Sequence, residues 1–106
     1  MKSALIALVL IAFAATSAAA QGVNLSGRYR CVQNCRGTGP AYATEYGWNL
    51  NLVNEVGEPS RAWIDWSGHI WAENWHMGAV YAPDGLAIQF DDGAVWQRDL
   101  RPAPTR

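Results

Sequence analysis

The residue types best suited to chemistry lie between Arg61 and Tyr81, where tryptophans alternate with acids, amides and histidines. Asp65, Ser67 and His69 are the residue types of a hydrolase, in which an acid orients a histidine that deprotonates a hydroxyl group. Ser67 falls within a predicted turn, however, and no oxyanion hole is evident in the sequence. We therefore expect a protein that is not an enzyme, with a small hydrolase using Asp65 and His69 as the lesser alternative.

Metal-ligand residue types also occur in this segment, as His69, Glu73 and His76. On a strand, residues four apart share one face and are about 13 Å from each other, at ~3.3 Å per residue. Zinc requires ligand atoms at ~2.0–2.3 Å, so one ion cannot join His69 and Glu73 on a straight strand. We expect no metal site and no cofactor.

Two other motifs are even weaker indications of a functional site. Asp91 and Asp92 are adjacent in a predicted turn, where aspartate bonds to its own backbone, and they are not a carboxylate pair held across a cleft. The stretch from Arg36 to Gly39 is rich in glycine but lacks the lysine and the strand–helix context of a phosphate-binding loop.

The only two cysteines, Cys31 and Cys35, are separated by three residues. In an oxidising compartment two cysteines this close most simply form one disulfide. A thioredoxin-like pair would have two intervening residues near a βαβ pattern, and a structural zinc site would need four ligands. We expect a structural disulfide.

Residues 1–20 have the features of a secretory signal peptide. Lys2 supplies the positive charge, an apolar run follows, and Ala18-Ala19-Ala20 precedes a cleavage site. The apolar run is too short to span a bilayer as a helix. We expect a secreted or periplasmic protein with no membrane span after cleavage. Residues 21–106 then form a single small domain, in which 101–106 are a frayed tail.

The charge distribution argues against nucleic acid as a partner. The formal net charge is −1, Lys2 is the only lysine, and the arginines form no run or stripe.

The elements that must position these residues are strands, because glycines punctuate short aromatic and β-branched runs and no helical period is present. Five segments have the form of a three-residue loop ending in glycine, in which glycine adopts the left-handed conformation. They are Glu55-Val56-Gly57, Trp66-Ser67-Gly68, His76-Met77-Gly78, Pro83-Asp84-Gly85 and Asp91-Asp92-Gly93.

These loops predict which residues share a face of the sheet. Residues that flank a three-residue loop differ by four in number, so paired residues in successive strands are all even or all odd. The odd face is polar, with aromatic residues set into it. The even face is almost entirely apolar, with Trp48, Leu50, Leu52, Ala62, Ile64, Ile70, Ala72, Val80, Ala82, Leu86, Ile88, Phe90, Ala94 and Trp96.

The even face is therefore the predicted core of an all-β protein. The expected strands cover 25–32, 43–54, 58–65, 69–75, 79–82, 86–90 and 94–99. Leu25, Tyr29 and Cys31 lie on the apolar side of the first strand, and residues 36–42 cross to the second. An antiparallel meander of about seven strands with one apolar face is expected to curl into a closed or nearly closed barrel.

The odd face is the candidate binding surface. Its register pairs Trp63 with Trp71 and Glu73 with Tyr81, which makes Trp71 and Tyr81 diagonal neighbours. Indole faces bordered by amides, acids and arginine suit a sugar, whose C–H faces stack while its hydroxyls form hydrogen bonds. We expect non-catalytic binding of a carbohydrate or cell-envelope glycan. The expected contact residues are Trp63, Trp71, Trp75, Tyr81, Arg61, His69, Glu73 and Asn51.

Three alternatives use the same aromatic residues. A protein partner, including an enzyme to be inhibited, is the main one, because Trp, Tyr and Arg dominate interface hot spots. A homodimer contact is the second. In the third, the aromatics are covered by the chain itself, since cross-strand aromatic pairs stabilise a sheet by roughly 0.2–1 kcal/mol without binding anything.

Overall fold

Eight strands follow one another along residues 23–100, the part of the chain that the computed structural model describes. The signal peptide predicted over 1–20 and the tail predicted over 101–106 lie outside the described residues. The strands are β1 (Gly27–Gln33), β2 (Pro40–Tyr46), β3 (Asn49–Val53), β4 (Pro59–Trp66), β5 (His69–Ala72), β6 (Met77–Tyr81), β7 (Ala87–Phe90) and β8 (Val95–Arg98).

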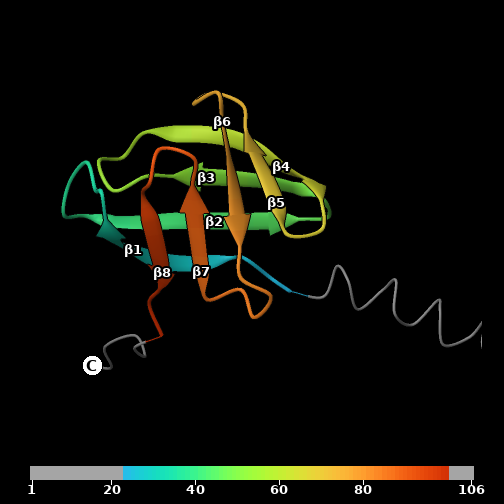
Figure 1. Ribbon diagram of the computed structural model, residues 1–106, viewed down its shortest axis with the longest axis horizontal. Coiled ribbons are helices and arrows are strands. Elements are labelled where there is room, and N and C mark those ends of the chain that lie inside the picture. The colour runs from blue at the N-terminus through green and yellow to red at the C-terminus, as the bar shows by residue number, and fades with distance from the viewer. Residues whose placement is uncertain (1–22, 101–106) are drawn as a thin grey trace, which may run out of the picture.

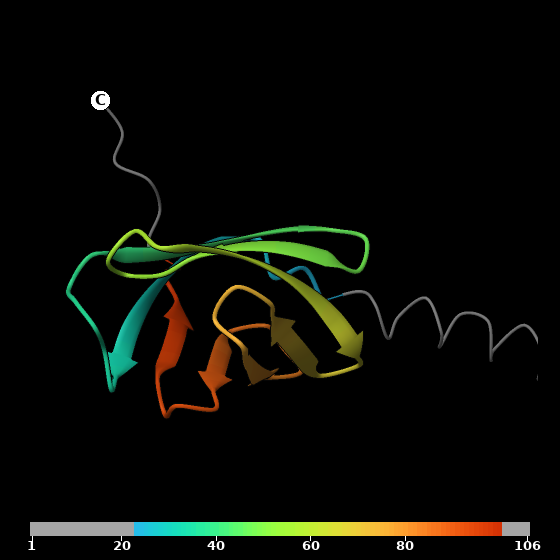
Figure 2. The same cartoon turned by 90° about the horizontal axis from the view of Figure 1, so that it is seen from above.

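The strands form the closed antiparallel barrel that the sequence predicted (Figure 1). Each strand pairs with the next, and β8 returns to pair with β1, so no strand of the barrel is left as an open edge. Figure 2 shows β2, β3 and β4 as one layer over β6, β7 and β8. Within residues 23–100 there is no helix long and apolar enough to cross a membrane.

The core fills the inside of this barrel. Buried and exposed residues alternate strictly along most of β4, which is the two-residue period of a strand with one face inward. Large side chains from both layers meet in the interior without a separate covering element. Those that are fully buried are Trp96, Tyr29, Leu25, Leu50, Leu52, Ile70 and Ile88.

The prediction of one strand over 43–54 is wrong, because β2 and β3 form a hairpin there. Tyr46 pairs with Asn49 across a two-residue turn made of Gly47 and Trp48. Gly47 has φ of 64°, as type II′ turns require of their first central residue. Trp48 is therefore 43% exposed in a turn and not part of the core. The predicted crossing over 36–42 is shorter than expected, since β2 begins at Pro40.

Three of the five predicted loops are confirmed. Those ending in Gly57, Gly68 and Gly93 have glycine at positive φ and keep the parity of the flanking strands. The loop predicted at 76–78 is wrong: residues 73–76 form a four-residue turn, and Ala72 pairs with Met77. The loop predicted at 83–85 also has one more residue, because Ala82 bonds to Ala87 across residues 83–86.

These two differences in loop length change which residues face the core in β6 only. Each four-residue loop changes the parity of the inward residues, so the second change cancels the first. In β6 the odd residue Ala79 is fully buried and Val80 is 51% exposed, contrary to the predicted even core. From β7 onward Ile88, Phe90 and Trp96 face inward as expected, but Leu86 lies in the loop and is 38% exposed.

The first strand and its disulfide agree with expectation. Leu25 and Tyr29 are fully buried, and Cys31 packs against the core. Cys31 and Cys35 are bonded, with their Cα atoms 5.7 Å apart. The bond closes a small loop at the end of β1.

Candidate functional site

An aromatic row crosses the outside of the barrel from β2 to β5. Tyr46 pairs with Asn49, Asn49 with Trp63, and Trp63 with Trp71. Because residues paired in this way project on the same side of the sheet, their side chains are lateral neighbours. Tyr46 is 53% exposed, Trp63 is 38% exposed, and Trp71 is half-buried. The predicted pairing of Trp63 with Trp71 is thus confirmed.

A polar row lies beside the aromatic row, two residues along each strand. Thr44 pairs with Asn51, and Asn51 pairs with Arg61. The backbone N–H of Glu73 donates to the carbonyl oxygen of Arg61 at 2.8 Å, which continues the row into the β5–β6 turn. Amides, a guanidinium and a carboxylate therefore lie next to the aromatic rings.

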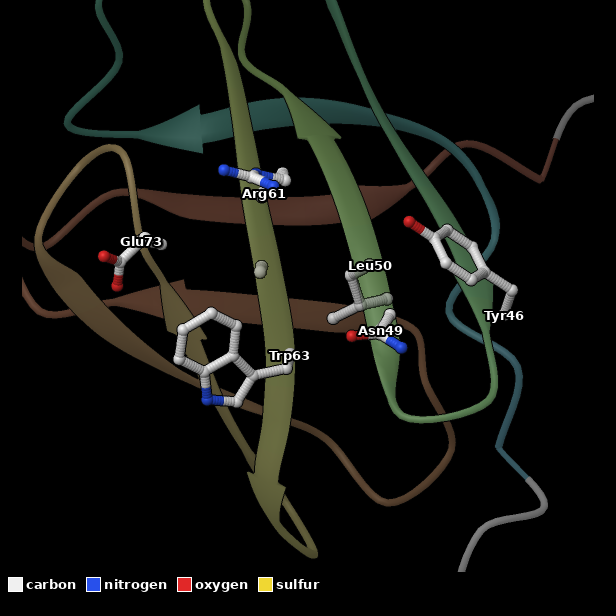
Figure 3. A pocket seen from close by; sticks show the side chains of 7 residues that line it. Tyr46, Asn49, Leu50, Arg61, Trp63 and Glu73 are labelled. Atoms are coloured by element: carbon white, nitrogen blue, oxygen red, sulfur yellow. The ribbon is translucent and has the colours of Figure 1, made fainter.

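The two rows line a hollow of about 290 Å³, which we call the outer groove. In Figure 3, Trp63 and Arg61 project from β4 on the same side, with Glu73 on one flank and Tyr46 on the other. The residues that line the groove are Tyr46, Asn49, Leu50, Arg61, Ala62, Trp63 and Glu73.

The carboxylate of Glu73 is held in place by the aromatic row. The indole N–H of Trp71 donates to Oε1 of Glu73 at 2.8 Å. This bond fixes the carboxylate beside the groove, and it uses the polar edge of an indole that is otherwise half-buried. Trp71 thereby positions Glu73 and is not itself a lining residue.

A second hollow of about 280 Å³ adjoins the groove further along β3 and β4. Arg61 lines both hollows. The second hollow is lined by Asn51, Leu52, Val53, Pro59, Ser60, Arg61 and Asn74.

Two predicted contact residues are partly buried and pack against the core. Trp75 packs edge-on against Phe90 and Trp96, with ring centroids 6.0 and 6.4 Å apart. Tyr81 also packs against the core, because the four-residue turn before β6 turns its odd residues inward. The predicted pair of Glu73 and Tyr81 is consequently not formed, and Tyr81 pairs with Ile88.

Tyr46 and Asn49 line the groove but are not among the contact residues expected from the sequence. The sequence places Tyr46 within a continuous strand over 43–54. The available signal was Gly47, because a glycine between two aromatic residues is a candidate for the first central position of a two-residue hairpin turn.

His69 forms a separate cluster outside the outer groove. Its Nδ1 atom lies 2.7 Å from Oδ1 of Asp65, so the predicted acid–histidine pair is present. The ring of Trp66 stacks on the imidazole, with centroids 4.2 Å apart. Within residues 23–100 no hydrogen bond joins Ser67 to His69.

One group of metal-ligand residue types comes close together in the described part of the chain. Ligand atoms of Cys31, Cys35 and Glu55 lie within 4.8 Å of one another. Both sulfur atoms are bonded to each other, which leaves the Glu55 carboxylate as the single ionisable group of the three. In this disulfide form the group does not present a ligand set for a metal.

Comparison of the chain with protein-family models, with curated proteins and with solved structures found no match.

Proposed function

We propose that this protein is an exported, non-catalytic carbohydrate-binding module, and that its ligand is a cell-envelope glycan. The observation that carries the proposal is the outer groove, in which Trp63 and Tyr46 stand beside Arg61, Asn49 and Glu73. Export is supported by the leader-like residues 1–20 and by the disulfide, which is typical of oxidising compartments.

Sugars suit this surface because they are amphipathic in the same way. A pyranose ring has C–H faces that stack on an aromatic ring, and a rim of hydroxyls that donate and accept hydrogen bonds. The exposed rings of Tyr46 and Trp63 supply the stacking surfaces. Arg61 donates, Glu73 accepts, and the amide of Asn49 does both. Hydrogen bonds to the two charged groups are the stronger ones.

Binding is favoured over hydrolysis by the number of carboxylates. Glycoside hydrolysis ordinarily uses two carboxyl groups that flank the scissile bond. Glu73 is the single carboxylate among the described residues that line the outer groove. One fixed carboxylate is sufficient to orient a hydroxyl.

A protein partner is the second candidate, and exposed aromatics beyond the groove favour it. Trp66 is 61% exposed, Trp48 is 43% exposed and Tyr42 is 44% exposed. Exposed apolar surface of this kind is used in protein interfaces. The groove is concave and has polar side chains beside its aromatic rings, which is the reason to prefer a sugar.

The test is titration calorimetry with soluble cell-wall oligosaccharides and the variant Trp63→Ala. We expect affinity to fall by about tenfold or more, because truncating a central stacking residue costs roughly 1.4 kcal/mol or more. Stability should change little, since Trp63 lies outside the core.

Trp66→Ala is the matched control. It removes the same type of side chain from an exposed site that lines neither hollow, and it should leave affinity unchanged. Equal loss in both variants, or no binding of any oligosaccharide by the wild type, would contradict the proposed function. A stoichiometric complex with another protein, unaffected by added sugars, would favour the second candidate.

A further inference from the structure

The two hollows lie one after the other along β3 and β4 and share Arg61, and together we call them the track. The outer groove is lined by Trp63 on β4, and the second hollow is lined by Pro59 on the same strand. These residues are four apart, so the track extends about 13 Å at ~3.3 Å per residue. A ligand that fills it is a chain of more than one sugar ring.

The two hollows differ in charge. The outer groove has both Arg61 and Glu73 in its lining, so a cation and an anion face the same space. In the second hollow Arg61 is the single charged residue among the described lining residues, and the amide residues Asn51 and Asn74 accompany it. An anionic group is therefore favoured in the second hollow, whereas Glu73 opposes it in the outer groove.

The guanidinium of Arg61 is free to bind such a group. Three ion pairs occur within residues 23–100, and Arg61 belongs to none of them. Its backbone is held on both sides, because its N–H donates to Oδ1 of Asn74 and its carbonyl accepts from Glu73. The strand is thus fixed under a side chain that has no protein partner in the described residues.

We propose that the ligand is an acidic oligosaccharide in which a neutral sugar is followed by a carboxylate-bearing sugar. The neutral unit stacks on Trp63 and Tyr46 in the outer groove. The carboxylate of the next unit lies in the second hollow and accepts two parallel hydrogen bonds from Arg61. Glu73 repels a carboxylate from the outer groove and so sets which unit occupies which hollow. This inference rests on the proposed function.

The experiment compares tetrasaccharides that differ only in their carboxylates. The probes alternate N-acetylglucosamine with glucuronic acid or with N-acetylmuramic acid, and each is paired with its carboxyl-reduced form. Titration calorimetry should show that at least one acidic probe binds roughly 10–100-fold tighter than its reduced form, as expected for charge-assisted hydrogen bonds. Arg61→Ala should abolish this preference, and Arg61→Lys should retain only part of it.

Arg30→Ala is the control for net charge, because Arg30 is exposed on β1 and lines neither hollow. It should keep the preference for the acidic probe. Equal binding of acidic and reduced probes, weakened in both by Trp63→Ala, would overturn this inference and leave the proposed function standing. A preference that survives in Arg61→Ala would overturn it as well. If no probe of either form binds, both proposals fail.

Discussion

Among single residues, Tyr29 combines a buried aromatic ring with a hydroxyl that has two hydrogen-bond partners. It is fully buried, and its hydroxyl donates to the carbonyl of Leu25 at 2.7 Å. Nη2 of Arg98 donates to the same hydroxyl at 2.9 Å, and the guanidinium lies 5.4 Å from the ring centroid. Burial raises the pKa of Tyr29 above its ordinary value, and the effect exceeds the opposing influence of Arg98.

This raised pKa predicts a loss of stability in alkali. Below the unfolded pKa of 10.0 the tyrosine is neutral in both states. Above it the unfolded chain releases the proton first, so unfolding becomes more favourable as the pH rises toward the folded pKa. The advantage of the wild type over Tyr29→Phe, about 1–3 kcal/mol near neutrality, should therefore shrink between about pH 9 and pH 11.

Urea unfolding of both proteins across that pH range measures the effect. Tyr42→Phe is the control for loss of a tyrosine hydroxyl, since Tyr42 is 44% exposed and its removal should change stability little. A gap between wild type and Tyr29→Phe that stays constant or widens in alkali would contradict the prediction.

At the scale of elements, loop length decides which side of a strand faces the core. The turn over 73–76 has an even number of residues, and it places Trp75 where the indole packs on Phe90 and Trp96. The left-handed residue of this turn is His76, with φ of 50°, and not the predicted Gly78. Burial of a large indole thus prevails over the local preference for glycine at a left-handed position.

The position of the left-handed residue can be tested by substitution. His76→Gly should be more stable than His76→Ala by about 0.5–1 kcal/mol, because relief of left-handed strain exceeds the added entropy of the unfolded chain. At Asn74, in the same turn but without positive φ, the order should reverse, with Gly less stable than Ala by about 0.5–1 kcal/mol. Thermal unfolding of the four variants measures the order of stability of Gly and Ala at each position. The same order at both positions would contradict the observed turn.

For the whole molecule, the barrel closes by strand pairing, and the disulfide is a local link at the end of β1. Residues of β1 and β8 pair from Tyr29 with Arg98 to Gln33 with Val95, and this joins the first strand to the last. The disulfide closes a loop of only five residues at the end of β1, where the backbone N–H of Arg36 donates to Oε2 of Glu55 at 2.6 Å. Short loops restrict the unfolded chain least.

We therefore expect the double variant Cys31→Ser, Cys35→Ser to remain folded. Its free energy of unfolding should fall by about 2 kcal/mol, the chain-entropy value for so short a loop. Oligosaccharide affinity should not change, because neither cysteine lines either hollow. Urea unfolding and calorimetry measure the two quantities. An unfolded double variant would show that the disulfide is needed to hold β1 in the barrel.

Much of this architecture can be predicted from the sequence alone. Alternating apolar residues and glycines at loop ends predicted an antiparallel barrel, three of its loops, its disulfide and most of its core, including Ile88 and Trp96. The neighbouring Trp63, Arg61 and Glu73 on the outside were also predicted, because strand alternation and a three-residue loop are local properties.

Tertiary structure alone decided where the other aromatic residues lie. Tyr46 lines the groove because Gly47 and Trp48 reverse the chain. Trp75 and Tyr81 pack against the core because the turn before β6 has four residues. A change of one residue in a loop exchanges the two faces of the following strand. The choice between such loops depends on which side chains fill the interior, and contacts such as that of Trp75 with Trp96 exist only once the barrel has closed.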